Sequence, residues 1–371
     1  MTATKNNTSA APIGVWFPQG FANLYQAQAD LRRADTTGRY RIIGSHPHPE
    51  FVGLQSADVA LVEPTDAREF REFALMLVRE HNVRVIVPSR RQAFFNKNAK
   101  LFAGLGVAVL TVADNATKAC IEDKLAFYRY LKPLNLVNIP EFEGFTTLAE
   151  FDAAYSALTP RASKVCIKPA YGVYGSGFRV LAERKNGLQD LLNESLTLSV
   201  AGLRERLGVD AGPTMLLMQY LDGDERSVDC LAKDGVLVAA VCRRKSNSPI
   251  AGQVIEDRPD LVKQVQNLTA HLKLNGLFNV QFKDHAGVPF LLEINPRMSG
   301  RSYYATAAGC NLPYLAAELF SGAKAIDELS FSVNFGLRIG NLASPMPLGL
   351  DKVQGKDGVN VNEIKSVRES K

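Results

Sequence analysis

The sequence lacks the cysteine patterns that mark zinc-bound or disulfide-bonded domains. Its 371 residues include only five cysteines, and no two of them have Cys-x-x-Cys spacing. We therefore expect neither a zinc ribbon nor a redox-active cysteine pair. Scattered thiols are typical of buried free cysteines in a reducing environment, so we expect a cytoplasmic protein. The five residues are Cys120, Cys166, Cys230, Cys242 and Cys310.

Long apolar runs and a basic block are also missing. No run approaches the ~20 apolar residues that a membrane-spanning helix needs. The polar start of the chain has no apolar core of the kind found in signal peptides. The net charge is +5, but the basic residues are spread along the chain without a nucleic-acid-binding motif. We therefore expect no membrane and no nucleic acid as partners.

The composition, with 46% hydrophobic and 22% charged residues, is sufficient for two or three globular domains. After a tail over residues 1–11 that we expect to be disordered, strand-like apolar segments alternate with helical ones. This alternation predicts an α/β domain with a doubly wound parallel sheet over residues 12–115. The predicted strands are 13–18, 40–45, 56–62, 83–88 and 106–110, and the predicted helices are 23–33 and 67–81.

A dinucleotide is not expected in this sheet. Gly14 and Gly20 are too far apart for the Gly-x-Gly-x-x-Gly turn that holds a pyrophosphate, and no other glycines supply it. We therefore expect the first domain to bind no dinucleotide of its own.

A β-hairpin is predicted near residue 285. The apolar segments 278–282 and 290–295 are joined by the turn sequence Asp-His-Ala-Gly at 284–287. A turn centred near Gly287 places Gln281 roughly opposite Glu293.

Alternation along the second strand assigns its side chains to two faces. Glu293 and Asn295 are expected on one face, and Leu292 and Ile294 on the other. One face then belongs to the core and the other is available for chemistry.

The polar face of this hairpin offers only oxygen ligands. Gln281, Glu293 and Asn295 suit Mg²⁺ shared with nucleotide phosphates better than they suit zinc. Arg297 and Arg301 follow directly, where their guanidinium groups are placed to hold a carboxylate or a phosphoryl group. The alternative to a metal-binding hairpin is an ordinary edge hairpin with a polar end, and motifs elsewhere in the chain must decide between the two.

A second motif combines a lysine with a glycine-rich loop. Lys168 ends a strand-like segment, and residues 171–177 form a loop that includes Gly175, Ser176 and Gly177. The lysine can reach the α- and β-phosphates while backbone N–H groups of the loop close over the β- and γ-phosphates. Because the lysine precedes the glycines, this is neither a Walker loop nor a kinase loop.

The two motifs, in this order, resemble those of the ATP-grasp superfamily. The segments Asn-Val-Gln-Phe at 279–282 and Glu-Ile-Asn-Pro-Arg-Met-Ser at 293–299 resemble in particular its carbamoyl-phosphate-synthase-like branch. The resemblance covers about residues 12–341. It implies a fold of mixed α/β and α+β class, in which residues 12–115 form a Rossmann-like pre-ATP-grasp domain. Residues 116–341 would form a two-lobed ATP-grasp domain, with a small lobe at about 160–222 and a large lobe at about 223–341. Residues 342–371 would be a C-terminal tail.

The resemblance also implies roles for residues that the sequence alone leaves unassigned. Lys124, in a single helix expected over 115–132, corresponds to a phosphate-reaching basic residue. The backbone of Gln219, Tyr220 and Leu221 corresponds to the segment that recognises adenine, and Glu225 to the carboxylate that holds the ribose. Arg243 or Lys245 is placed to stabilise the transferring phosphoryl group. The strand ends near 18–20 and 89–91 are candidates for lining the acceptor-substrate cleft.

The function implied is that of an ATP-dependent carboxylate-amine ligase with ATP and Mg²⁺, or Mn²⁺, as cofactors. A small carboxylate and an amine would be its substrates, and a homodimer would be common for such an enzyme. Gln281 stands where many amino-acid ligases have an acidic residue, so a bicarbonate-activating enzyme that forms carbamoyl or carboxy phosphate stays an alternative. A non-catalytic ATP-binding regulatory module is a third.

Overall fold

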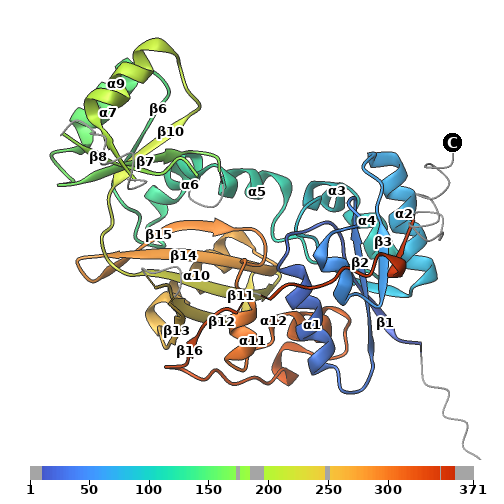
Figure 1. The fold of residues 1–371 in the computed structure, drawn as a ribbon. Coiled ribbons are helices and arrows are strands. Elements are labelled where there is room, and N and C mark those ends of the chain that lie inside the picture. The colour runs from blue at the N-terminus through green and yellow to red at the C-terminus, as the bar shows by residue number, and fades with distance from the viewer. Residues whose placement is uncertain (1–10, 173–175, 184–195, 247–250, 343, 356–371) are drawn as a thin grey trace, which may run out of the picture.

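The computed structural model describes residues 11–172, 176–183, 196–246, 251–342 and 344–355, and contains three sheets (Figure 1). The predicted mixed α/β and α+β class is confirmed, since the first sheet is parallel and the other two are mainly antiparallel. No helix in these ranges is long and apolar enough to cross a membrane.

The first sheet has the strand order β17-β3-β2-β1-β4-β5, and all of its pairings are parallel. Helix α1 packs on one face, while α2, α3 and α4 pack on the other, which is the doubly wound arrangement. The strands are β1 (Ile13–Phe17), β2 (Tyr40–His46), β3 (Val59–Val62), β4 (Val83–Ile86), β5 (Ala108–Val109) and β17 (Val353–Gln354). The helices are α1 (Leu24–Ala34), α2 (Ala67–Glu80), α3 (Gln92–Lys97) and α4 (Ala99–Gly104), with 3₁₀ turns η1 (Val52–Ser56) and η4 (Leu350–Lys352).

A topological switch point lies between β1 and β4. These strands are neighbours, but β1 leads to β2 on one side, while β4 leads to β5 on the other. The loops that follow the two strands therefore diverge at the carboxyl edge of the sheet, where ligands commonly bind in doubly wound folds.

Strand β17 differs from the peripheral tail expected after residue 342. It pairs with β3 at the edge of the first sheet, and its Val353 is fully buried against Leu54 and Ala60. A strand of two residues in a polar stretch is too short to show hydrophobic periodicity. Val353 is buried because β17 pairs at the edge of the first sheet.

The second sheet forms the small lobe with α7 and α9 on it, in the order β6-β10-β7-β8-β9. It begins upstream of residue 160, where we expected this lobe to start. Thr147 caps α7 in a capping box with Glu150. The elements are β6 (Phe142–Phe145), α7 (Leu148–Leu158), β7 (Val165–Pro169), β8 (Arg179–Ala182), β9 (Thr197–Ser199), α9 (Val200–Val209) and β10 (Met215–Gln219).

The third sheet has the order β15-β14-β11-β12-β13-β16, with α10 on one face and α12 on the other. The core under α12 is continuous with the core under α1, so the first and third sheets share one apolar layer. The elements are β11 (Glu225–Lys233), β12 (Val236–Arg244), β13 (Gln253–Glu256), α10 (Pro259–Leu272), β14 (Gly276–His285), β15 (Val288–Asn295), α11 (Tyr303–Ala307), α12 (Leu312–Phe320), η3 (Ile326–Glu328) and β16 (Arg338–Ile339).

Two helices connect the first domain to the small lobe, where we expected a single one (Figure 1). Helix α5 (Asn115–Glu122) ends at Asp123, and α6 (Lys124–Leu131) begins directly after it, followed by η2 (Lys132–Leu134). The extended Asp123 accepts a hydrogen bond from the backbone of Ala126 and so caps α6. The break places Lys124 in the first turn of a new helix.

Candidate active site

The hairpin of β14 and β15 has the predicted register. Gln281 pairs with Glu293, and Asn279 pairs with Asn295. The turn has positive φ at both central residues, Ala286 (49°) and Gly287 (78°), as a two-residue hairpin turn requires.

The predicted assignment of side chains to the faces of β15 is wrong at Leu292. The register shifts between Gln281 and Phe282, so that Leu292 is the extra residue of a β-bulge. Leu291 and Ile294 therefore enter the core under α10, while Leu292 packs with the residues of α6 and the small lobe. A bulge inverts the alternation, and a single sequence carries no signal for it.

Tyr128 of α6 covers this bulge. Its hydroxyl lies 2.9 Å from the carbonyl oxygen of Leu291 and 2.8 Å from that of Leu292. Complete burial raises the pKa of Tyr128 well above its usual value, so the hydroxyl keeps the proton that it donates. The residue thus ties α6 to the strand that carries Glu293.

The oxygen-bearing side chains of the hairpin lie together. The amide of Asn295 donates to Glu293 Oε1 at 3.0 Å, and Arg297 Nη2 donates to Asn295 Oδ1 at 3.3 Å. Gln281 lies across from Glu293 in the register and donates to Asn279 Oδ1 at 3.4 Å.

This donor set fits a divalent cation that shares its coordination with phosphates. It provides one carboxylate and two amide oxygens, which are the hard ligands that Mg²⁺ or Mn²⁺ prefers. Within the described residues there is no cluster of three or more histidine, cysteine or acidic side chains that could hold a metal without further ligands.

Lys124 extends from α6 toward the hairpin. Its Nζ donates to the carbonyl of Gly172 at 2.8 Å and lies 3.4 Å from Glu293 Oε2. The side chain is buried, so this ion pair is weakly screened. Lys124 therefore joins the glycine-loop segment to the acidic hairpin.

Lys168 lies on β7, beside the same groups. Burial lowers its pKa to about 8, while the charge of Glu293 opposes that change and the charge of Lys124 adds to it. These influences place two lysines and Glu293 within electrostatic reach of one another. The Lys168 ammonium is partly buried and lies 5.7 Å from the ring centre of Tyr128, so it is favourably placed for a polyphosphate.

The glycine loop is described only in part. Gly175 lies outside the described residues, whereas Ser176 and Gly177 lie within them. Gly177 has φ of 76°, and a Cβ there would come within 2.8 Å of the ring of Pro169. Only glycine therefore fits at the end of this loop.

The segment predicted to recognise adenine has its backbone donors partly occupied. Gln219 N–H donates to Glu141 at 2.8 Å and Tyr220 N–H donates to Lys164 at 2.8 Å. In the described part of the chain, the N–H of Leu221 has no such partner. The Gln219 carbonyl accepts a weak bond from the Cys166 thiol at 3.9 Å. Leu221 and Gln219 are thus the donor and acceptor available to a purine edge.

Glu225 and Lys245 form an ion pair at the start of β11. Both side chains are partly exposed, and the Lys245 N–H also donates to the Glu225 carbonyl at 2.8 Å. This contact places Lys245 with the predicted ribose carboxylate. The sequence predicts Lys245 as one of two candidates for stabilising the transferring phosphoryl group.

Arg243 is buried and held on all sides. Its guanidinium donates to Asp229 Oδ2 at 2.8 Å, to Ser299 Oγ at 2.8 Å and to Ser227 Oγ at 3.0 Å. A further bond to Gln253 completes its set. With these contacts Arg243 anchors the loop after β15.

Arg297 and Arg301 lie in the loop that Arg243 anchors. The first domain holds this loop as well, since Asn23 donates to the Ser299 carbonyl at 2.9 Å and Gln92 donates to the Pro296 carbonyl at 2.6 Å. The guanidinium carbon of Arg301 lies 6.0 Å from the Tyr304 ring centre.

Sequence reasoning missed the aromatic partner of Arg297. The guanidinium carbon of Arg297 lies 4.9 Å from the ring centre of Phe21, and that of Arg90 lies 4.6 Å from the same ring. Phe21 directly follows the Gln-Gly turn after β1, which was the available signal. Strand-end loops of a doubly wound sheet are where ligands bind.

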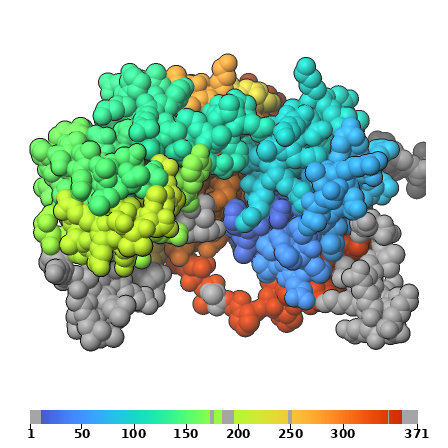
Figure 2. All heavy atoms as spheres, turned by 90° about the horizontal axis from the view of Figure 1, so that it is seen from above, coloured from blue at the N-terminus to red at the C-terminus, as the bar shows by residue number. Residues whose placement is uncertain are grey.

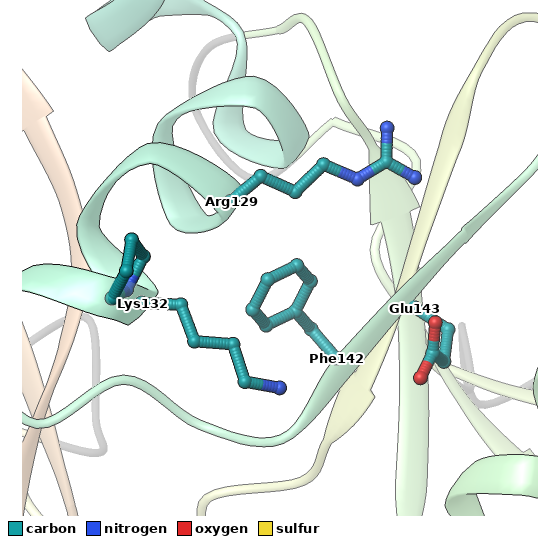
Figure 3. Close-up of a pocket in the computed structure, with 5 residues that line it drawn as sticks. Arg129, Lys132, Phe142 and Glu143 are labelled. Carbon is teal, nitrogen blue, oxygen red and sulfur yellow. The ribbon is translucent and has the colours of Figure 1, made fainter.

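A cavity of about 410 Å³ is lined by Arg129, Lys132, Pro133, Phe142 and Glu143. Figure 3 shows Arg129 and Lys132 on two sides of the Phe142 ring. Phe142 in turn meets Tyr128 edge-on at 5.3 Å. None of the predicted site residues lines this cavity.

Comparisons with known proteins agree with this geometry. Residues 211–343 match a family model described as ATP-grasp in the biosynthetic pathway with Ter operon. The carbamoyl phosphate synthase large chain of Thermomicrobium roseum is 26% identical over 381 aligned positions, which cover 96% of this chain and 33% of that protein. The chain thus spans about a third of the length of this curated relative.

Solved structures share the fold. An N5-carboxyaminoimidazole ribonucleotide synthetase in complex with ADP superimposes with a TM-score of 0.62 at 13% identity, over 89% of this chain and 81% of that one. An L-amino acid ligase from Bacillus licheniformis gives a TM-score of 0.54 at 16% identity, over 84% and 75% of the two chains. At these identities the likeness concerns the arrangement of the three sheets.

Proposed function

Taking as premise that this chain is an ATP-grasp protein of the carbamoyl-phosphate-synthase-like type, we propose that it is an ADP-forming ligase. In this proposal it activates a small carboxylate as an acyl phosphate and couples it to an amine. Both substrates are small molecules, and their identity is a matter for experiment.

The observation that carries the proposal is the meeting of three segments at one point. Lys124 of α6, Lys168 of β7 and Glu293 of β15 influence one another electrostatically, and Glu225 of β11 contributes to the field at Lys168. Two cations suited to phosphates and an oxygen-rich hairpin suited to a metal thus lie close together. A module that only binds nucleotide would need the lysines but not the hairpin together with Arg297.

The chain's own residues divide the work. Lys168 and Lys124 would hold the phosphates, and the Gln219 carbonyl and Leu221 N–H would hold the purine edge. Glu225 would accept from the ribose hydroxyls. Glu293, Asn295 and Gln281 would hold a divalent ion, which when bound neutralises charge on the terminal phosphates.

Arg297 would orient the carboxylate for in-line attack. Its guanidinium is fixed by Asn295 on one side and stacks near Phe21 on the other. The carboxylate oxygen would attack the γ-phosphorus, the bond to ADP would break, and the amine would later displace phosphate. Such catalysis consists mainly of positioning and of electrostatic stabilisation.

Bicarbonate is the second candidate for the activated acid, because the amide Gln281 stands opposite Glu293 where an acidic residue would mark many amino-acid ligases. The curated relative is a carbamoyl phosphate synthase, which supports the same alternative.

The test is release of ADP and phosphate from ATP with Mg²⁺, using a panel of amino acids and small carboxylates and a separate arm with bicarbonate. Release that needs one carboxylate and one amine supports the ligase. Release with bicarbonate alone favours the second candidate. Tight ATP binding without release in any arm contradicts both and favours a regulatory module.

A further inference from the structure

Two cations lie around one aromatic ring at the switch point of the first sheet. Phe21, in the loop after β1, has Arg297 of the β15 loop at 4.9 Å from its ring centre and Arg90 of the β4 loop at 4.6 Å. Three chain segments from two domains thus meet at Phe21. The exposed guanidinium of Arg90, held beside this ring, is suited to binding an anionic group.

A buried carboxylate fixes the two loops of the first domain. Glu63 accepts from the Gln19 N–H at 3.1 Å and from Arg91 Nε at 3.0 Å, and Arg90 N–H donates to the Gln19 carbonyl at 3.2 Å. Because both loops are tied to the same group, Phe21 and Arg90 are held in place before a ligand arrives.

The neighbouring arginines point in opposite directions. Arg91 has φ of 57°, in the left-handed region, and its side chain turns inward to Glu63. Arg90 is exposed, and no carboxylate of a described residue pairs with it. A non-glycine residue at this φ is strained. The left-handed backbone at Arg91 directs its side chain inward, while the side chain of Arg90 faces outward.

The position of this group is suitable for the second substrate. In Figure 2 a hollow opens between the green and yellow small lobe and the blue first domain, with the dark blue start of the described chain at its edge. Arg297 reaches into the same region from the hairpin that would hold the metal. A molecule bound at Arg90 and Phe21 would therefore lie next to the carboxylate that Arg297 orients.

We propose that Arg90 and Phe21 bind the amine substrate through an anionic group, so that the amine is one whose other end carries a carboxylate or a phosphate. This inference rests on the proposed ligase function and adds the class of amine to it. Arg90 is a specificity-determining residue here, because it contacts the acceptor and leaves the activation step to other groups.

The experiment compares Arg90→Ala with Arg41→Ala, an exposed arginine near the opposite, amino end of β2. With the amine found in the panel, Arg90→Ala is expected to raise its KM by about 10- to 100-fold, the cost of a charge-assisted contact. The KM for ATP is expected to stay as in the wild type, and Arg41→Ala to change neither. An unchanged KM for the amine in Arg90→Ala overturns the proposal.

A second arm removes the anion from the substrate. With the wild type, the carboxamide or neutral analogue of the same amine is expected to show the same rise in KM that Arg90→Ala shows with the anionic amine. Combining the neutral analogue with Arg90→Ala is expected to raise the KM no further. Additive losses contradict direct contact. Comparing carboxylate-bearing with phosphate-bearing amines identifies the anion.

A binding measurement separates this proposal from the ligase function. Succinate and inorganic phosphate are each titrated in a thermal-unfolding assay, where a ligand of the native state raises Tm. Stabilisation by either anion in the wild type and Arg41→Ala, but not in Arg90→Ala, supports the anion site even if no amine turns over. Equal stabilisation of all three proteins, or none, contradicts it.

Discussion

Lys124 Nζ lies 3.4 Å from Glu293 Oε2, which joins the first turn of α6 to the last strand of the hairpin. The same ammonium group donates to the Gly172 carbonyl at the start of the glycine loop. One side chain therefore links the phosphate side of the site to its metal side. Without a bound polyphosphate, the carboxylate and the lysine neutralise each other.

Replacing that carboxylate should abolish turnover and leave the fold intact. Glu293 is partly exposed and lies outside the apolar core, and Glu293→Gln is isosteric, so the variant should fold, with a lower unfolding temperature because buried Lys124 loses its partner. ADP release should fall by at least about 100-fold, because a charged ligand for the phosphate-bound cation is lost. Glu72→Gln on α2, an exposed carboxylate far from the hairpin, is the matched control. Wild-type ADP release by Glu293→Gln would contradict the assigned role.

The pKa of Lys168 predicts how nucleotide binding depends on pH. Burial lowers this pKa to about 8, so the ammonium loses its proton as the pH rises through that value. ATP affinity should therefore weaken as the pH rises above 8, by at most about tenfold per pH unit. Isothermal titration across this range measures the effect.

Arginine at the same position tests whether Lys168 is the titrating group. Lys168→Arg keeps its charge and should flatten the profile between about pH 7 and 9.5. Lys100→Arg, an exposed lysine of α4, should leave the wild-type profile unchanged. A profile that still bends near pH 8 in Lys168→Arg would assign the titration to another group.

Tyr128→Phe should destabilise the protein and impair catalysis together. The variant leaves the Leu291 and Leu292 carbonyls at the bulge without their donor, which costs about 1–3 kcal/mol of unfolding free energy. The turnover number should fall as well, because Glu293 follows the bulge directly. Denaturant unfolding and ADP release measure the two effects. Tyr130→Phe, which removes only an exposed contact with His271, should change stability by less than about 0.5 kcal/mol.

Arg243 should act as a positioning residue. Arg243→Met leaves Asp229 buried without its partner, so a loss of about 3–5 kcal/mol is expected. In a cycle with Asp229→Asn, the double variant should lose less than the sum of the single variants by more than about 1 kcal/mol. The KM for ATP should change little, whereas the turnover number should fall because the loop carrying Arg297 loosens. Additive stability losses, or a loss confined to the KM for ATP, would contradict this role.

Local patterns predicted the elements of this site well. The alternation of β14 and β15 and the turn at Gly287 were sufficient to pair Gln281 with Glu293, because hairpin register depends on adjacent residues. The same holds for the parallel strands of the first sheet, whose apolar segments are continuous.

Breaks in regular structure could not be predicted from the sequence. The end of α5 at Asp123 and the bulge at Leu292 each interrupt a pattern that continues on both sides. Both are stabilised by partners elsewhere in the fold, as Tyr128 stabilises the bulge. Periodicity cannot report a contact with a distant segment.

By itself, then, the sequence determined the fold class, the order of the motifs and the chemical character of the hairpin, since these follow from neighbouring residues. Only the tertiary structure decided which basic residues face the site. It buries Arg243 beneath the Arg297 loop, pairs Lys245 with Glu225, and gathers Phe21, Arg90 and Arg297 at the switch point. The physical reason is that a charge's role depends on its burial and on its partners, and those partners come from segments far away along the chain.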